Sequence, residues 1–150
     1  ASSAASDVYK RQESNNMAII ESAIANKRRG NHVIVSSVEH SSVKEPFRYL
    51  EENGFNVTYL PVDNRGLVSV DALKEALDEE TILVSVMLVN NEIGTIEPVE
   101  KIGKIVKDYN KDTQRIYFFK NMHQSIKYDN RTPSSFNRLY TLNKCYHILF

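Results

Sequence analysis

The feature that most constrains the fold is an apolar run that stops abruptly in polar residues. Residues 82–89 read Ile-Leu-Val-Ser-Val-Met-Leu-Val, and Asn90, Asn91, Glu92 and Gly94 follow almost directly. A run this apolar is typical of a strand buried on both faces, as in a parallel sheet covered by helices. Such sheets bind ligands at the carboxyl ends of their strands, where a glycine lets the chain turn. Taken alone, the motif is equally compatible with an asparagine-rich turn without further function.

Strands and helices alternate along much of the chain. Short apolar segments predict further strands at 32–36, 57–62 and 116–119, and helical patterns predict helices over 14–26, from a capping box at Ser42–Glu45 to Gly54, over 71–78, and from Pro98 onward. The first helix is expected to bury Met17, Ile20 and Ile24, and the last to bury a stripe from Val99 to Tyr109. This alternation predicts an α/β fold with a mainly parallel sheet flanked by helices.

Size and composition narrow the classes of function. The chain has 150 residues with 41% hydrophobic content, enough for the core of one domain. Its 19 basic and 19 acidic residues cancel, which argues against nucleic acid or an anionic membrane as a partner. No apolar run approaches the roughly 20 residues of a membrane span, and the first thirty residues lack a signal-peptide core. The lone Cys145 fits a reducing compartment, so we expect a cytoplasmic location.

Four motifs stand in this order along the chain: Glu13-Ser14-Asn15-Asn16, Val38-Glu39-His40, the stretch from Gly54 to Pro61, and Val89-Asn90-Asn91-Glu92-Ile93-Gly94. Together they resemble the cysteine desulfurase branch of the class V aminotransferases, which are pyridoxal phosphate (PLP) enzymes of fold type I. The resemblance runs from about Glu13 to about Gln124. It implies the large PLP-binding domain of a homodimeric enzyme that converts L-cysteine to L-alanine and leaves a persulfide on the protein. The sulfur would pass to an acceptor or scaffold protein for iron-sulfur cluster or thio-cofactor assembly.

The resemblance assigns cofactor contacts to three residues. His40 would stack on the pyridine ring of PLP and serve as an acid-base group. Asn91 would donate a hydrogen bond to the phenolic oxygen, and Gln124 would reach the same oxygen or the imine. Each residue follows a predicted strand, so all three are expected to meet at one edge of the sheet. Taken alone, His40 reads more readily as a solvent-exposed or helix-capping histidine, and the alternative for Asn91 is stabilisation of the turn.

The sequence departs from the family pattern at other cofactor contacts. Asn121 stands where the family has the aspartate that pairs with the pyridinium nitrogen, and a neutral amide would keep that nitrogen protonated poorly. Residues 10–12 (Lys-Arg-Gln) replace the family's phosphate-binding Gly-Ala-Thr. Lys144 lies near the expected Schiff-base lysine but is out of register by about two residues. Cys145 is not the counterpart of the sulfur-accepting cysteine, which lies beyond this chain in the family.

We divide the chain into three parts on this basis. Residues 1–12 are interpreted as a non-native or disordered leader, 13–125 as a partial PLP-binding domain, and 126–150 as a divergent or frame-damaged tail. Desulfurases of this family are much longer. The sequence is therefore interpreted as a fragment that is inactive as it stands.

Other functions remain open at this point. Within the same class, the source enzyme could be a selenocysteine lyase or a small-substrate aminotransferase. A nucleotide-binding α/β module would require a glycine-rich loop. The five scattered glycines form no G-x-G-x-x-G, which argues against this alternative. A non-catalytic α/β interaction module would account for the departures at the cofactor contacts. The four histidines show no metal-ligand spacing, so no metal is expected.

Overall fold

The computed structural model describes residues 17, 19–87, 95–111, 116–121 and 146–149. Within these ranges, five strands form one sheet in the order β2-β1-β3-β4-β5. Residues 19–25 are helical and precede the first strand. The remaining elements are β1 (His32–Ser36), α2 (Ser41–Glu52), β2 (Asn56–Leu60), α3 (Val70–Ala76), β3 (Thr81–Met87), α4 (Val99–Tyr109), β4 (Tyr117–Asn121) and β5 (Tyr146–Leu149).

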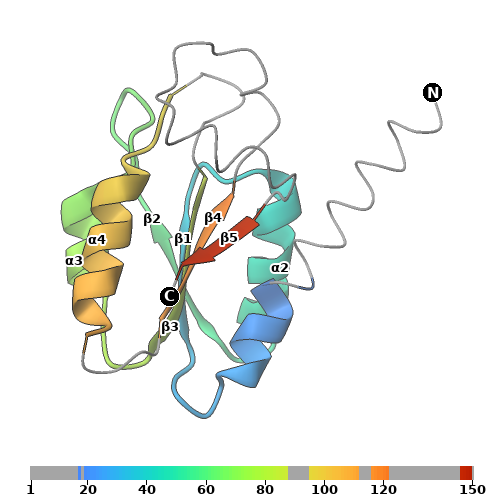
Figure 1. Ribbon diagram of the computed structural model, residues 1–150. Helices are drawn as coiled ribbons and strands as arrows, with labels where there is room; N and C mark the ends of the chain where they lie inside the picture. Colours follow the sequence, from blue (N-terminus) through green and yellow to red (C-terminus); the bar gives the residue numbers. More distant parts are fainter. Residues whose placement is uncertain (1–16, 18, 88–94, 112–115, 122–145, 150) are drawn as a thin grey trace.

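The sheet is mainly parallel, as the alternation of strands and helices predicts. Strand β1 pairs in parallel with β2 and with β3, and β3 pairs in parallel with β4. Strand β5 pairs with β4 in the antiparallel sense and forms one edge of the sheet. The sequence did not predict β5, which falls within the segment 126–150. In Figure 1 the carboxyl ends of the parallel strands face the top of the molecule.

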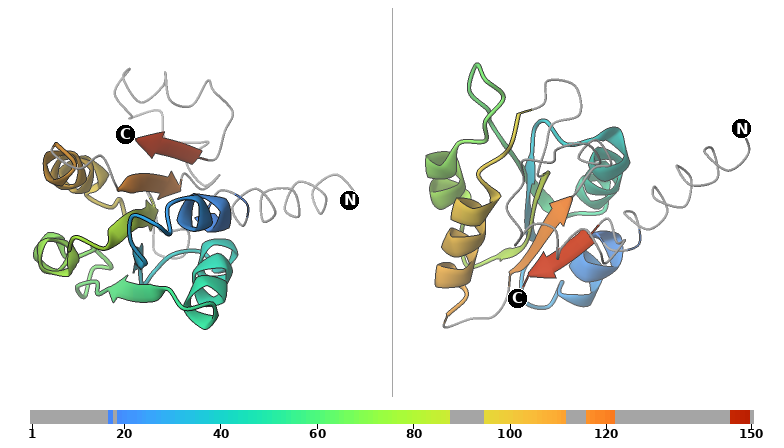
Figure 2. Two further views of the ribbon diagram at one scale, coloured as in Figure 1. Left: turned by 90° about the horizontal axis from the view of Figure 1, so that it is seen from below. Right: turned by 45° about the horizontal axis from the view of Figure 1, so that its top comes forward.

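Helices cover both faces of the sheet. Figures 1 and 2 show α3 and α4 on one face, and α2 with the helix of residues 19–25 on the other. Side chains of β1 alternate between the two layers: Ile34 packs into the cluster with α3 and α4, whereas Val33 and Val35 pack into the cluster with α2. Every residue of β1 and β3 is buried. This double burial explains why the two strands read as nearly continuous apolar runs.

The buried face of the first helix differs from the expected one. Met17 and Ile24 are 57% and 55% exposed, whereas Ile19 and Ala23 are fully buried. The predicted stripe was therefore wrong. The segment carries apolar residues on two adjacent faces, and helical periodicity alone does not decide which of them meets the sheet.

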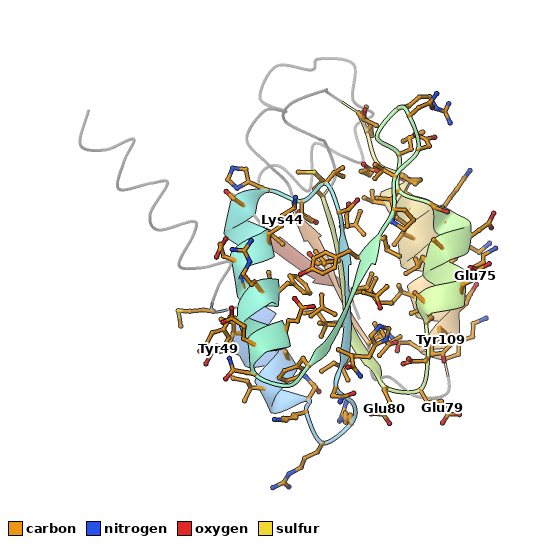
Figure 3. The ribbon with its side chains drawn as sticks, turned by 180° about the vertical axis from the view of Figure 1, so that it is seen from behind. Lys44, Tyr49, Glu75, Glu79, Glu80 and Tyr109 are labelled. Atoms are coloured by element: carbon orange, nitrogen blue, oxygen red, sulfur yellow. The ribbon has the colours of Figure 1, made fainter. Side chains whose placement is uncertain are left out.

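Two other helices also differ from the sequence-based expectation, α4 in its buried face and α2 in the residue at which it begins. Tyr109 was expected in the buried stripe of α4 but is 39% exposed, and Val106 takes the buried position. Figure 3 shows Tyr109 and Tyr49 on the outer surfaces of α4 and α2.

Helix α2 begins at Ser41, so the carbonyl of His40 accepts from the amides of Val43 and Lys44 at 2.9 and 3.0 Å. The capping box predicted from Ser42 was therefore wrong.

No helix within the described ranges combines the length and apolar character that crossing a membrane would require.

Candidate functional site

Two of the residues that the sequence analysis singled out, His40 and Asn121, follow or end strands of the described sheet. Strand β1 ends at Ser36, four residues before His40, and Asn121 ends β4 opposite Met87 at the end of β3. Because β3 lies between β1 and β4, the ends of these two strands are about 10 Å apart, or two strand spacings. Three further candidates, Asn91, Gln124 and Lys144, lie outside the described residues.

The turn that presents His40 is built on Ser36. The Ser36 carbonyl accepts from the amide of Glu39 at 3.3 Å, and its hydroxyl accepts from the amide of Val38 at 3.3 Å. The next amide, of Ser37, donates to the Leu60 carbonyl at 3.0 Å and ties the turn to the end of β2. His40 then precedes α2 and is half-buried. Its position therefore follows from a hydrogen-bonded turn rather than from a free loop.

Glu39 fastens this turn to the middle of the sheet. Its side chain is buried, and the Ser85 hydroxyl of β3 donates to Glu39 Oε1 at 3.5 Å. Ser85 is itself fully buried. A buried carboxylate, paired with a buried hydroxyl, thus directly precedes in sequence the histidine that the resemblance assigns to the cofactor. The sequence analysis used Glu39 only as part of a motif and gave Ser85 no role. A single hydroxyl in an apolar strand nevertheless indicates a buried polar group that needs a hydrogen-bond partner.

A hairpin of residues 61–69 rises from the end of β2 at the same edge (Figure 1). Val62 and Val68 form an antiparallel bridge, and Gly66 takes the positive φ of 79° that the turn requires. Asp63 organises the turn, because Oδ1 accepts from the amides of Leu67 and Arg65 at 3.0 and 2.8 Å. The bond from Leu67 is the largest cause that lowers the pKa of the Asp63 carboxyl below its ordinary value of 3.8.

Glu97 joins this hairpin to the segment before α4. Its side chain is 2% exposed, and Oε2 accepts from the Val68 amide at 2.8 Å. The other oxygen, Oε1, accepts no hydrogen bond from any residue within the described ranges. Burial raises the pKa of the Glu97 carboxyl above its ordinary value of 4.5, although the bond from Val68 opposes the rise. The sequence analysis missed this residue, because a glutamate before a helix is usually an exposed first-turn acid.

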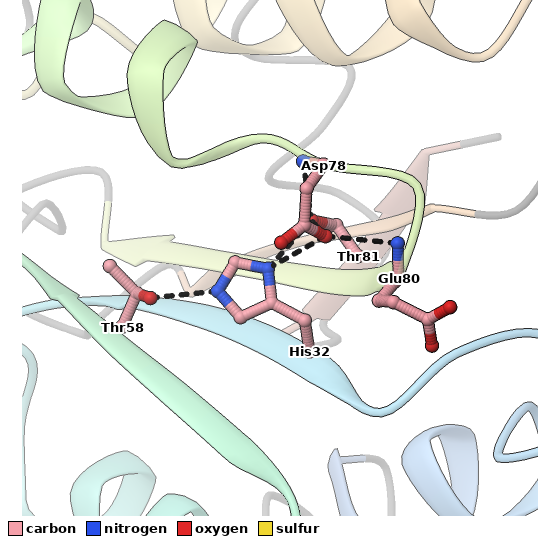
Figure 4. A network of polar contacts seen from close by, with 5 residues as sticks. All are labelled: His32, Thr58, Asp78, Glu80 and Thr81. Carbon is pink, nitrogen blue, oxygen red and sulfur yellow. Dashed lines mark hydrogen bonds and ion pairs between the residues drawn. The ribbon is translucent and has the colours of Figure 1, made fainter.

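A second polar cluster lies at the opposite, amino edge of the sheet. Figure 4 shows His32 of β1 between Thr58 of β2 and the pair Asp78 and Thr81. His32 Nε2 lies 2.7 Å from Thr58 Oγ1, and Nδ1 lies 2.8 Å from Thr81 Oγ1 and 3.2 Å from Asp78 Oδ1. The sequence analysis placed His32 in a predicted strand and found no metal-ligand spacing among the four histidines. In the described part of the chain, no group of three or more histidine, cysteine or acidic side chains could hold a metal ion.

Comparisons with known proteins agree with this arrangement. The family model Aminotransferase class-V matches residues 12–114. A cysteine desulfurase IscS of Clostridium botulinum is 50% identical over 114 residues, which are 76% of this chain and 28% of that protein.

Two solved structures share the fold over most of the chain. A NifS-like protein has a TM-score of 0.68 at 35% identity and covers 77% of this chain and 31% of its own. A structure of SspA in complex with cysteine has a TM-score of 0.63 at 32% identity and covers 75% of this chain and 37% of its own. The chain spans 28% of the length of the curated relatives at the head of the comparison.

Proposed function

Because the chain belongs to the class-V aminotransferase family, we propose that it forms part of the PLP-binding domain of a cysteine desulfurase. The observation that carries the proposal is the carboxyl edge of the sheet. There, a hydrogen-bonded turn after β1 leads into His40, and the neighbouring parallel strand β3 leads into the Asn91 motif. Ligands of open α/β sheets bind at this edge. The similarity to a cysteine desulfurase IscS, and to SspA solved in complex with cysteine, supports L-cysteine as the substrate of the whole enzyme.

The side chains at this edge fit one part of PLP and not another. A half-buried imidazole at His40 suits the face of a flat ring, and stacking needs no charge on it. In this proposal Asn91 and Gln124 hold the phenolic oxygen, for which an amide is a neutral donor. PLP, when bound, supplies an electron sink for breaking bonds at the substrate's α- and β-carbons. His40 would hold or release a proton above the ring.

Asn121 does not fit the pyridinium side of the ring. It ends β4 at the position where the resemblance calls for an aspartate. An amide carries no charge to hold a proton on the ring nitrogen, so one charge-assisted hydrogen bond is lost. Residues 10–12 lack the small side chains of a phosphate-binding nest, and Lys144 is out of register for the covalent anchor. We therefore propose that this chain alone binds PLP weakly and does not desulfurate cysteine.

The activity of the whole enzyme remains part of the proposal. In the longer protein, sulfur would pass to an acceptor or scaffold protein, and the enzyme would be a homodimer. A selenocysteine lyase or an aminotransferase of the same class would use the same carboxyl edge. The desulfurase is supported over these alternatives by the 50% identity to a protein named cysteine desulfurase IscS and by the similarity to SspA, which was solved in complex with cysteine.

The location of PLP can be tested even when its binding is weak. We would titrate the ¹⁵N-labelled chain with PLP and follow the backbone and imidazole resonances. Shifts are expected at Ser37 and His40 of the carboxyl edge, and His32 at the amino edge serves as an internal control. Replacement His40→Ala should reduce the shifts that remain in the turn. Shifts confined to the amino edge, or a response of His32 equal to that of His40, would contradict the proposal.

A further inference from the structure

Backbone hydrogen bonds fix the first half of the turn between β1 and α2. The Ser37 amide donates to the Leu60 carbonyl at 3.0 Å, and the Glu39 amide donates to the Ser36 carbonyl at 3.3 Å. These bonds attach the turn to the ends of β2 and β1. His40 follows Glu39 and directly precedes α2, so the second half of the turn decides where His40 lies.

The side chain of Glu39 connects this second half to the neighbouring strand β3. The Ser85 hydroxyl donates to Glu39 Oε1 at 3.5 Å, across 46 positions of the sequence, and the two residues are 0% and 3% exposed. Ser85 pairs with Val35 of β1, which packs in the buried cluster with α2, so Ser85 projects to the same face of the sheet. The Glu39 carboxyl therefore lies on the face of the sheet that α2 covers.

Burial makes this pair sensitive to the loss of either partner. Removing a carboxyl or a hydroxyl from water costs free energy unless a hydrogen bond compensates for the lost hydration. Deleting one partner leaves the other desolvated, whereas deleting both removes the penalty together with the bond. A separation of 3.5 Å is long for two oxygen atoms, which ordinarily lie about 2.5–3.0 Å apart in a hydrogen bond, so the effect should be moderate.

A helix-dipole role does not account for the placement of Glu39. An acid near the amino terminus of a helix is favourable while exposed and needs no partner. Glu45 of α2 is an exposed acid, and it forms a surface ion pair of 3.2 Å with Arg48. Glu39 instead is buried against a strand that is distant in sequence. Glu45 thus provides the matched control for any replacement of Glu39.

We propose that Glu39 is a positioning residue for His40. Ser36 and Ser37 fix the start of the turn, and the contact between Glu39 and Ser85 fixes the residue directly before His40 against β3. The backbone of His40, and with it the direction in which the imidazole leaves the chain, is thereby held relative to the sheet. The use of His40 toward PLP rests on the function proposed above, whereas its positioning by Glu39 does not.

The test uses the full chain and needs no cofactor. Amide hydrogen exchange and relaxation of the imidazole resonances would be measured for Glu39→Ala, Glu39→Gln, Ser85→Ala, the double variant Glu39→Ala/Ser85→Ala and Glu45→Ala. In Glu39→Ala the Val43 amide, which donates to the His40 carbonyl, should exchange about two- to tenfold faster. The His40 ring should gain fast motion in the same variant.

The other variants separate the hydrogen bond from the bulk of the side chain. Glu39→Gln keeps an oxygen acceptor and should restore most of the protection. Ser85→Ala should loosen His40 although it leaves the sequence of the turn unaltered. The double variant should loosen His40 no more than Glu39→Ala does, because both replacements remove the same contact. Glu45→Ala should change neither signal. Additive effects of Glu39→Ala and Ser85→Ala would overturn the proposal, because the two side chains would then act independently.

The second histidine distinguishes positioning from general stability. The ring of His32, at the amino edge, should move in Glu39→Ala as it does in the unmodified chain. An equal gain in motion at His32 and His40 would overturn the proposal, because Glu39 would then contribute only to overall stability. If Glu39→Ala does not fold, Ser85→Ala carries the same comparison, and an unchanged His40 ring there would overturn the proposal. Failure of PLP to perturb His40 would instead count against the proposed function and leave this positioning intact.

Discussion

Thr58 and His32 are joined by a contact of 2.7 Å between Oγ1 and Nε2, which links the edge strand β2 to β1. His32 Nδ1 lies near Asp78 Oδ1, and an ionised carboxylate only accepts hydrogen bonds. In the neutral imidazole the proton is therefore on Nδ1, and the Thr58 hydroxyl donates to Nε2. The Thr81 hydroxyl also donates to Asp78 Oδ1 at 3.0 Å and completes the cluster. The network satisfies a histidine that is only 6% exposed.

Removing the Thr58 hydroxyl should destabilise the fold. Replacement Thr58→Val keeps the shape of the side chain but leaves His32 Nε2 buried without its donor. We expect a loss of about 1–3 kcal/mol in the free energy of unfolding, measured by urea denaturation. Thr58→Ser keeps the hydroxyl and serves as the control. A loss in Thr58→Ser without a loss in Thr58→Val would show that the methyl group, and not the hydrogen bond, matters.

Truncating a side chain should cost much more unfolding free energy on the buried face of the first helix than on its exposed face. Ile19 is fully buried, so Ile19→Ala should cost about 2–5 kcal/mol of unfolding free energy. Ile24 is 55% exposed, and Ile24→Ala should change the same quantity by less than about 0.5 kcal/mol. Thermal or urea denaturation of the two variants would check this. A larger cost at Ile24 would restore the face that the sequence analysis predicted.

Gly30 should tolerate no side chain. A Cβ at this position would overlap the Glu80 carbonyl, which accepts from the His32 amide at 2.9 Å. Gly30→Ala is expected to cost about 1–3 kcal/mol of stability, measured by urea denaturation. Gly54 gives the contrast, since it has open space but a φ of 88°. Asparagine, which tolerates positive φ, should therefore be better than alanine at position 54 and worse at position 30.

Asp63 and Glu97 should shape the pH dependence of stability in opposite directions. The folded pKa of Asp63 is lowered, so its contribution is present above the ordinary value of 3.8 and is lost as pH falls through the folded pKa. Burial raises the folded pKa of Glu97, so its contribution is present below the ordinary value of 4.5 and is lost as pH rises through the folded pKa.

Urea denaturation across the acid range would check both signs. Asp63→Asn should flatten the loss of stability on acidification below about pH 4. Glu97→Gln should remove the decline on raising the pH and so gain stability relative to the unmodified chain toward neutral pH. A Glu97→Gln variant that falls further behind the unmodified chain as pH rises would contradict the assigned direction.

The sequence predicted the positions of helices and strands better than it predicted which face of each helix is buried. The apolar runs of β1 and β3 and the alternation with helices were enough for a mainly parallel sheet, because strands this apolar are typical of a sheet that helices cover on both faces. Met17 and Tyr109 were placed wrongly because a helix with adjacent apolar faces is oriented by its tertiary neighbours. Strand β5 was missed because a four-residue edge strand leaves almost no periodic signal.

Only part of the candidate site could be predicted from the sequence. The carboxyl edge follows from parallel pairing, and His40 lies between the end of β1 and the start of α2. Neither Glu97 nor the Glu39–Ser85 pair could be identified from the sequence, because their importance comes from burial against segments distant in sequence. The convergence of Asn91 and Gln124 with His40, the role of Lys144, and the interpretation of 1–12 and 126–150 remain predictions.

The most direct test is a visible-absorbance titration of the purified chain with PLP, beside the variant Asn121→Asp. The account predicts no saturable, borohydride-sensitive band for the unmodified chain and no alanine formed from cysteine. Asn121→Asp should bind PLP about ten- to a hundredfold more tightly, because a charge-assisted hydrogen bond is worth about 1.5–3 kcal/mol. A strong band in the unmodified chain that borohydride abolishes and that Lys144→Ala removes would contradict the account and identify Lys144 as the covalent anchor.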